Sequence, residues 1–380
     1  MDRIAVVGIG QTRYEKRKKD ETFADMVFEA CSKALADAGV SITDIDNVLS
    51  ISNDFWDGRT ISSMAVQDAA GVRHKNTSCV EGDGVFGAIY GMARTMSGSY
   101  DTTMVVAHHK GSESKMHLIT NAMFDPIYQR SLGIDYVSSA ALQANAYMER
   151  YGITEEQLAK VSVKNHGNAQ FNPLAQLPLE ISIKDVLESP QIAEPLKRLD
   201  CSPTSDGACA IILSNERGLK RFKTRPIWIK GVAYCSDSYF LGERDLATSP
   251  ALQKAAEDAY RMAGIKDPKK EIQVAEVADV FSYMELMWYE GLGFCRPGEG
   301  GKLVDSEASQ LGGEIPVNPS GGILAGRPPV YVAGLAAIAE IVLQLRGEAG
   351  QRQVKNARVG LAHGINGPCA QSHAVMILGN

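Results

Sequence analysis

The sequence IAVVGI at residues 4–9 is followed by a loop and by a segment with a regular apolar stripe that ends before Gly39. The same order returns in the second half of the chain, where IWIKGV at residues 227–232 is followed by a striped segment that ends before Gly264. Apolar residues spaced by three and four predict a helix with one buried face, and a glycine directly after it is a common left-handed cap. The chain is therefore predicted to consist of two similar halves.

Each half continues with the same four elements: a strand, a helix rich in small residues, a buried strand and a final strand. We expect them at residues 47–51, 80–97, 103–107 and 208–213 in the first half, and at residues 274–279, 332–345, 358–362 and 373–378 in the second. Strands that alternate with helices predict an α/β fold, here with two mixed sheets and with helices between and outside them. We place the halves at residues 1–220 and 221–380, with an inserted loop region at about 110–200 in the first half.

The composition excludes several classes of function. The 380 residues carry a formal net charge of -6 and no strongly basic run, so nucleic acid is not an expected partner. No stretch approaches the roughly 20 consecutive apolar residues that a helix needs to span a bilayer, so no membrane is expected as a partner. Seven scattered cysteines without a CxxC pair predict reduced thiols in a cytoplasmic protein and no metal site in this chain.

Cys79 stands at the predicted start of the helix at residues 80–97. Backbone N–H groups and the helix dipole at such a place favour a thiolate. The same N–H groups can bind the oxyanion that forms when a thioester or a ketone is attacked. This placement makes Cys79 a candidate nucleophile, although a lone cysteine at a helix start is more often structural.

Two glycine-bearing loops lie at matching places in the repeat. The sequence NPSGG at residues 318–322 occupies the place of the Cys79 loop, and its small residues let the backbone approach a ligand or a neighbouring segment closely. The loop at residues 363–369 occupies the place of residues 108–111. Turn formation alone also explains glycine at such positions, so both interpretations remain open.

Five short segments and the residues around Cys79 carry specific patterns. The segments are KNH at residues 164–166, NPLAQ at 172–176, CSPTSDGA at 201–208, YEGLG at 289–293 and NPSGG at 318–322. Together they resemble the thiolase superfamily, in particular its sterol-carrier-protein-type and archaeal branches, and Cys79 followed by Gly82 falls where the family's nucleophile motif lies. The resemblance covers essentially the whole chain. It implies a duplicated five-layer αβαβα fold with coenzyme A as a substrate.

The resemblance also implies roles for residues of the two loops. Cys79 would be the nucleophile, and the N–H groups of Cys79 and Gly367 would hold one oxyanion. The family's cysteine in the last loop falls on Ile365 in this sequence. Cys369 and His363, which lie near that position, are therefore candidate acid–base groups.

Other catalytic groups of the family are replaced here. The serine two residues after the nucleophile is Glu81, residues 278–281 read ADVF in place of HDCF, and Arg327 stands in the place of a catalytic histidine. One oxyanion donor is typically worth ~2.7–4 kcal/mol, so these losses argue against condensation of plain acetyl-CoA. Arg327 predicts a carboxylate partner, either on the substrate or on Glu81, and Tyr331 adds a phenol as a further candidate acid or base. The predicted substrate-binding residues are Arg327, Glu81, Ser320, Gly321 and Asn318.

Three functions are compatible with these residues. The first is cleavage or formation of a C–C bond in a carboxylate-bearing β-keto acyl-CoA, such as benzoylsuccinyl-CoA, through an acyl-enzyme on Cys79. The second is retro-aldol cleavage of a β-hydroxy acyl-CoA, in which Tyr331 or Tyr283 transfers a proton and Cys79 is dispensable. The third is a catalytically degenerate thiolase-like subunit that binds a partner.

The resemblance finally implies an assembly. We expect a homodimer, because thiolases pair through the sheet edge of the first half. Members of these branches often pair with a small OB-fold protein that carries a zinc ribbon and supplies contacts to coenzyme A. Such a subunit is the second expected partner.

Overall fold

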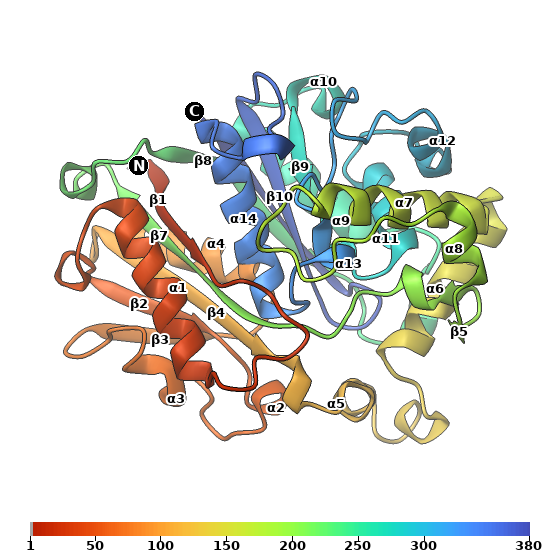
Figure 1. Cartoon of the computed structure of the whole chain (residues 1–380), viewed down its shortest axis with the longest axis horizontal. Coiled ribbons are helices and arrows are strands. Elements are labelled where there is room, and N and C mark those ends of the chain that lie inside the picture. Colours follow the sequence, from red (N-terminus) through yellow and green to blue (C-terminus); the bar gives the residue numbers. More distant parts are fainter. Residues whose placement is uncertain (1–2) are drawn as a thin grey trace.

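The computed structural model describes residues 3–380 and confirms the duplicated α/β fold (Figure 1). Nine strands form one mixed sheet in the order β3-β2-β4-β7-β1-β8-β11-β10-β9. The strands of the first half are β1 (Ile4–Gln11), β2 (Asn47–Ile51), β3 (Asn76–Val80), β4 (Thr102–Lys110) and β7 (Asp206–Asn215). Those of the second half are β8 (Ile227–Ser236), β9 (Val274–Glu276), β10 (Val359–Asn366) and β11 (Ser372–Gly379).

The two halves meet where β1 and β8 run side by side. Two residue pairs join these antiparallel strands, Ala5 with Trp228 and Val6 with Ile227, so the two expected sheets are continuous at this edge. Within the halves, β2 runs parallel to β3 and β4, and β10 runs parallel to β9. Residues 318–322 occupy in the second half the place that the Cys79 loop occupies in the first, because Val317 pairs in parallel with β9 as β3 pairs with β2.

Helices complete the layers. α4 (Gly84–Met96) and α14 (Tyr331–Arg346) pack against each other and against strands of both halves. α1 (Phe23–Ala38) covers the outer face of the first half, and α9 (Pro250–Ala263) covers that of the second (Figure 1). The expected five-layer αβαβα arrangement is therefore confirmed.

The sequence of α14 explains its central place. YVAGLAAIAEIVLQLR is apolar or small around almost its whole circumference, which is typical of a helix that is buried on all sides. Small residues also let α4 approach closely, since a Cβ on Gly84 would lie 2.1 Å from the backbone nitrogen of Leu335. The contact between the two central helices therefore requires glycine at position 84.

The outer helices end as the repeat predicts. Gly39 closes α1 with a φ of 69°, and Gly264 closes α9 with a φ of 75°. Both angles lie in the left-handed region, where a side chain with a Cβ is strained. The start of α1 is fixed by Thr22 and Asp25, which form a capping box.

A long segment between β4 and β7 bridges the halves. It contains α5 (Met116–Ala122), α6 (Tyr136–Tyr151), α7 (Glu155–Ala169), α8 (Ile183–Glu188), β5 (Gln191–Ala193) and β6 (Leu196–Lys197). The shorter helices are α2 (Asp54–Asp57), α3 (Met64–Gln67), α10 (Pro268–Glu271), α11 (Ser282–Gly291), α12 (Gly300–Asp305) and α13 (Gly322–Ala325). Since α7 packs on α11 and α13, the inserted segment contacts the second half. The division of the halves between residues 220 and 221 stays a prediction.

The start of α4 differs from the prediction. Residues 76–80 form strand β3, and the helix begins at Gly84 instead of residue 80. Asp83 causes the difference, because its side chain accepts a hydrogen bond from the N–H of Val85 and caps the helix there. The strand lasts until Val80 because that residue still pairs with β2.

Two strands are longer than predicted. β4 continues to Lys110 and β10 continues to Asn366, since their last residues still pair with the antiparallel neighbours β7 and β11. His109 and His363, both expected in loops, therefore lie within strands. Among the helices of residues 3–380, none combines the length and the apolar character that crossing a bilayer requires.

Candidate active site

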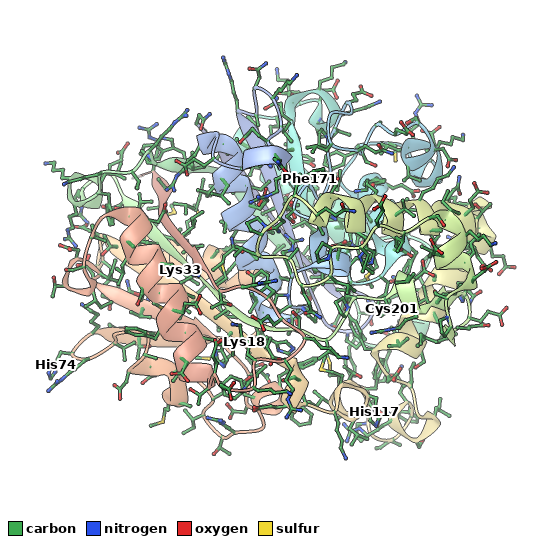
Figure 2. All side chains as sticks on the ribbon, viewed as in Figure 1. Lys18, Lys33, His74, His117, Phe171 and Cys201 are labelled. Atoms are coloured by element: carbon green, nitrogen blue, oxygen red, sulfur yellow. The ribbon has the colours of Figure 1, made fainter. Side chains whose placement is uncertain are left out.

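A cavity of about 820 Å³ lies where the two halves and the inserted segment meet. Its walls come from α2, α5, the start of α6 and the loop before α4, and from residues 201–204, 278, 280–281, 329–331 and 365–368. A volume of this size falls in the range of ligand-binding pockets. Figure 2 shows two of the lining side chains, Cys201 and His117 of α5, on the same side of the molecule. We take this cavity as the candidate active site.

The cavity wall combines aromatic and basic side chains. The aromatic ones are Phe55, Trp56, Tyr136, Tyr239, Phe281 and Tyr331, and the basic ones are Lys115, His117 and Arg198. The rings are in contact with one another: Tyr136 and Phe281 lie 5.4 Å apart between centroids, and Trp56 and Tyr331 lie 6.5 Å apart. Such a wall suits an apolar acyl group next to an anionic one.

Tyr331 is the first residue of α14, and its side chain lies on the cavity wall. It is 1% exposed, and its oxygen has no hydrogen-bond partner among the described residues. Burial and the nearby carboxylates of Asp57 and Glu81 raise the pKa of Tyr331 well above its ordinary value. The phenol therefore stays protonated, which suits a proton donor that finds its acceptor on a bound substrate.

The loop after Cys79 and the loop at residues 363–369 meet at the cavity. Glu81 and Gly367 both line it. A Cβ on Gly82 would lie 3.3 Å from the side-chain nitrogen of Asn366, so the loops are in contact. The N–H of Gly367 donates to the side-chain oxygen of Asn366 at 3.0 Å. Its role as an oxyanion donor stays a prediction.

Cys79 does not line the cavity, although Glu81, two residues later in the sequence, does. It belongs to strand β3, so its expected position at a helix N-terminus is wrong. The side chain is exposed at the edge of the sheet, and its sulfur lies 3.3 Å from Oγ of Ser52. The cavity wall begins two residues later, at Glu81. The role of Cys79 as a nucleophile stays a prediction.

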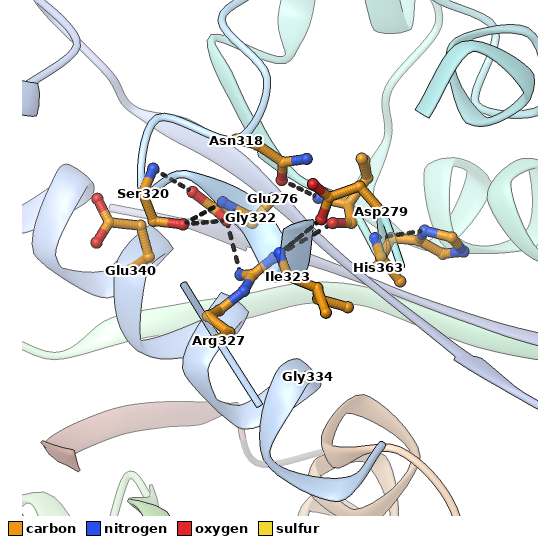
Figure 3. A network of polar contacts seen from close by, with 12 residues as sticks. Glu276, Asp279, Asn318, Ser320, Gly322, Ile323, Arg327, Gly334, Glu340 and His363 are labelled. Carbon is orange, nitrogen blue, oxygen red and sulfur yellow. Dashed lines mark hydrogen bonds and ion pairs between the residues drawn. The ribbon is translucent and has the colours of Figure 1, made fainter. Parts of the chain in front are cut away.

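Arg327 lies in a buried network of polar contacts (Figure 3) and does not line the cavity. It is 2% exposed and donates to Oε2 of Glu276 at 2.7 Å and to the carbonyl oxygen of Val277 at 3.2 Å. The predicted pair with Glu81 is therefore wrong. A buried guanidinium needs a carboxylate within reach, and the end of β9 supplies Glu276. Of the two roles that the sequence leaves open, the structure supports the internal ion pair.

Three predicted substrate-binding residues belong to the same network. The hydroxyl of Ser320 donates to Glu276 at 2.7 Å, and the side-chain amide of Asn318 donates to Glu285 at 2.7 Å. Gly321 packs against α7 so closely that a Cβ would come within 2.6 Å of a side chain there. Asn318, Ser320 and Gly321 do not line the cavity, and their expected contact with substrate stays a prediction. Their small or polar side chains instead satisfy buried carboxylates and close packing.

The network holds more carboxylates than cations. Its charged members are Glu276, Asp279, Glu285, Lys164 and Arg327. Asn165 donates to Asp279 and to Glu285 at 2.7 Å each. Burial and the negative charge of Glu285 raise the pKa of Asp279 to about 8. Through Asp279 the network adjoins the wall residues Ala278, Val280 and Phe281.

His363 is buried next to a second histidine. Its Nε2 lies 3.0 Å from Nδ1 of His373, and the two rings stack 5.3 Å apart beside Trp288. Burial lowers the pKa of His363 to about 3. Because β10 continues through this position, the side chain points toward Trp288 and does not line the cavity. The role of His363 as an acid–base group stays a prediction, which this buried position does not support.

The buried histidines predict a loss of stability in acid. Their pKa values in the folded protein are lower than the ~6.5 of an exposed histidine, so the unfolded chain binds more protons below pH 6.5. The free energy of unfolding should then fall by about 1.4 kcal/mol per pH unit for each histidine as the pH drops from 6.5 toward 4. Urea denaturation of the wild type and His363→Asn at pH 7, 6 and 5 measures this slope. The variant should show a shallower slope, and the exposed control His74→Asn should not.

Cys369 and Tyr283 also lie outside the cavity. The thiol of Cys369 donates to the carbonyl oxygen of Ser139 at 3.2 Å, and burial raises its pKa to about 11. The phenol of Tyr283 donates to the side-chain oxygen of Gln143 at 2.8 Å. Both side chains pack against α6 and do not line the cavity, so neither is placed to transfer a proton to a substrate.

Three residues at or behind the cavity were missed by the sequence reasoning. Trp56 and Asp83 line it, and His109 packs edge-on against Tyr331 with 6.4 Å between ring centroids. The sequence could have identified Asp83, because an aspartate directly before the glycine-rich start of a helix is a typical N-cap. Nothing in the local sequence marks Trp56 or His109.

Comparisons with known proteins give matches along the whole chain. The family of thiolase N-terminal domains matches residues 4–217, and the thiolase C-terminal domain-like family matches residues 233–380. The acetyl-CoA acetyltransferase of Methanothermobacter thermautotrophicus is 36% identical over 372 residues, which cover 96% of each chain. Sterol carrier protein 2 of Bos taurus is 32% identical over 389 residues, which cover 96% of this chain and 70% of that protein.

Solved structures show the same fold. The Ltp2-ChsH2(DUF35) aldolase superimposes with a TM-score of 0.85 at 24% identity, covering 99% of this chain and 97% of that one. Human mitochondrial 3-ketoacyl-CoA thiolase superimposes with a TM-score of 0.74 at 14% identity, covering 100% and 99%. At these identities the likeness concerns the fold.

The duplicated five-layer fold, with a cavity where its halves meet, defines a thiolase-fold protein. The two domain matches and the archaeal relative show in addition that the chain belongs to the thiolase family. Proteins of this family use coenzyme A as a substrate. Its members include two archaeal acetyl-CoA acetyltransferases that are 36% and 33% identical to this chain, so the chain belongs to a family of acyltransferases.

Proposed function

We propose that this protein breaks or forms a C–C bond in an acyl-CoA by aldol chemistry, with Tyr331 as the proton donor. The observation that carries the proposal is the buried phenol of Tyr331, which lies on the cavity wall without a hydrogen-bond partner among residues 3–380. The position of Cys79, with its thiol turned toward Ser52 at the sheet edge, supports the same choice. Aldol cleavage forms no acyl-enzyme and needs no cysteine at the cavity.

The proposed reaction uses two groups of the cavity wall. The carboxylate of Glu81 takes the proton of the substrate's β-hydroxyl, the bond between the α and β carbons breaks, and the β carbon becomes a carbonyl. The electron pair of that bond passes to the α carbon as a thioester enolate, and Tyr331 gives its proton to this carbon. The proton on Glu81 then returns to the phenolate of Tyr331.

Thiolytic cleavage of a β-keto acyl-CoA is the second candidate. The relationship to acetyl-CoA acetyltransferases favours it. The thiolate of Cys79 would attack the keto carbon, the C–C bond would break, and Tyr331 would protonate the enolate. The thiol of coenzyme A would then give its proton to the phenolate of Tyr331 and displace the Cys79 thiolate from the acyl-enzyme. A carboxylate-bearing substrate such as benzoylsuccinyl-CoA would meet Lys115, His117 or Arg198 instead of Arg327.

The substitution Cys79→Ala distinguishes the two reactions. Aldol cleavage predicts turnover within about twofold of the wild type, because the thiol is not a reacting group. Thiolysis predicts a loss on the order of 10⁶-fold, as for removal of a covalent nucleophile. Two assays are needed: release of the carbonyl product from β-hydroxy acyl-CoA esters, and coenzyme A-dependent cleavage of β-keto acyl-CoA esters. Cys235→Ala, in strand β8, is the matched control. Loss of all activity in Cys79→Ala alone would establish thiolysis.

The assembly expected from the resemblance also remains a proposal. β3 is the outer strand of the first half, and its residues are exposed or half-buried, so a second copy of the chain can pair along it. A small OB-fold subunit with a zinc ribbon can add contacts to coenzyme A at the mouth of the cavity. Sedimentation of the purified chain at micromolar concentration tests the dimer, and a single species of monomer mass would exclude it.

A further inference from the structure

The helix that carries Tyr331 begins under strain and without a cap of its own. Its N-cap residue is Val330, which has a φ of 69° and a ψ of -121°. A positive φ is an outlier for a β-branched residue and persists only where the surroundings enforce it. The segment also offers no side-chain hydrogen bond to the first turn of α14. Tyr331 follows directly, so the strain lies next to the proposed proton donor.

Asp83, the N-cap residue of α4, supplies the side-chain hydrogen bond that the start of α14 lacks. Its Oδ1 accepts from the N–H of Val85 at 2.9 Å, which caps α4. Its Oδ2 accepts from the N–H of Gly334 at 2.8 Å, in the first turn of α14. A single carboxylate therefore lies at the N-terminal ends of two helices, where both helix dipoles favour a negative charge.

The surrounding sequence leaves room for this carboxylate. A Cβ on Gly334 would lie 2.0 Å from Oδ1 of Asp83, and a Cβ on Gly364 would lie 1.9 Å from the same atom. Both positions must therefore be glycine while Asp83 keeps this conformation. Asp83 is 2% exposed, and it lines the same cavity as Tyr331.

The charge of Asp83 depends on pH near neutrality. Burial raises the pKa of Asp83 to about 7, against hydrogen bonds from Val85, Gly334 and Gly84 and the charge of Arg327. The groups that face it are these backbone N–H groups of α4 and α14, Gly364 of β10 and, at longer range, Arg327. The ionised carboxylate accepts from both helices, and protonation weakens these bonds.

We infer that Asp83 is a positioning residue for Tyr331, which holds the first turn of α14 against the strain at Val330 and so fixes the phenol in the cavity. The inference rests on the proposed role of Tyr331. A displacement of about 1 Å can cost roughly 10²-fold in rate, so a loosened first turn should reduce turnover without reducing binding. Asp83 acts through Tyr331 and does not itself react.

The experiment uses the full chain with a β-hydroxy acyl-CoA substrate. Asp83→Asn retains one acceptor oxygen but presents an amide to the second helix, so kcat should fall by about 10- to 100-fold while KM changes by less than about threefold. Val330→Gly removes the strain, because glycine adopts a positive φ freely. The double variant Asp83→Asn/Val330→Gly should therefore recover most of the lost kcat.

Two controls separate positioning from a general loss of stability. Thr22→Ala removes the cap of α1, which covers the outer face of the sheet, and should leave kcat unchanged. The pH profile of the wild type requires no variant to fold: kcat should fall about tenfold per pH unit below about pH 7 as Asp83 becomes protonated, and Asp83→Asn should lack this limb.

Several results would overturn the inference. They are full kcat in Asp83→Asn, equal losses in Asp83→Asn and Thr22→Ala, no recovery in the double variant, or a flat wild-type profile between pH 8 and 5.5. If Tyr331→Phe lowers kcat but Asp83→Asn does not, the inference fails and the proposed function stands. If Tyr331→Phe leaves kcat unchanged, the proposed function itself fails.

Discussion

Replacement of Tyr331 by phenylalanine should lower the turnover of a β-hydroxy acyl-CoA by roughly 10²–10⁴-fold, the usual contribution of a positioned general acid. The substitution removes one oxygen and keeps the ring, so the edge-on contacts with Trp56 and His109 persist. That oxygen has no hydrogen-bond partner among the described residues, so its removal should cost the fold little. The loss should therefore appear in kcat and not in KM, because the proton moves in the transition state.

Steady-state kinetics with Tyr283→Phe as the control measure this effect. Tyr283 is a buried phenol of α11 that does not line the cavity, and the sequence offered it as the alternative to Tyr331. Its substitution removes the hydrogen bond to Gln143, which should lower the free energy of unfolding by about 1 kcal/mol. Because Tyr283 does not line the cavity, kcat should stay within a few-fold of the wild type. Full activity in Tyr331→Phe together with a large loss in Tyr283→Phe would contradict the assignment.

Replacement of Arg327 by methionine should reduce the free energy of unfolding by about 3–5 kcal/mol. The substitution leaves Glu276, which is fully buried, without its cation, and an uncompensated buried carboxylate is costly. Arg327→Lys should lose less, because an ammonium keeps the charge but not the two-pronged contact with Glu276 and the carbonyl of Val277. Chemical denaturation monitored by tryptophan fluorescence and by circular dichroism checks both values.

An exposed arginine provides the matched control. Arg261 pairs with Asp258 on the surface of α9, and Arg261→Met should change the stability by about 0–1 kcal/mol. The activity of Arg327→Lys should also fall equally for dicarboxylic and monocarboxylic acyl-CoA substrates, because its guanidinium does not line the cavity. A normal stability combined with a selective loss for the dicarboxylic substrate would restore Arg327 as a substrate clamp.

The repeat was the part of the fold that the sequence predicted well. Local periodicity shows which residues of a strand or a helix face the core, and the glycines after α1 and α9 mark the helix ends. The same two signals at matching places gave the order of the strands along the chain in both halves, except that β3 was not predicted. They did not show how far β4 and β10 extend, because an extension depends on pairing with a strand that is distant in the sequence.

The nucleophile loop shows how a difference of two residues changes the site. The motif suggested Cys79 as the residue in the cavity, whereas β3 runs on to Val80 and the cavity begins at Glu81. Successive side chains of a strand point to opposite sides, so the end of the strand decides which residue enters the cavity. The pairing of β3 with β2 sets that end, and the sequence around Cys79 carries no record of it.

By itself, then, the sequence determined the duplicated α/β fold, its family and the place of Tyr331 near the site, because these depend on periodicity and on short local patterns. The tertiary structure alone decided that Arg327 pairs with Glu276, 51 positions away, and that Asp83 binds Gly334, 251 positions away. A buried charge must find a partner, but the identity of that partner depends on which elements pack together. A local pattern of apolar and polar residues records the burial of a side chain and not the neighbour that it meets there.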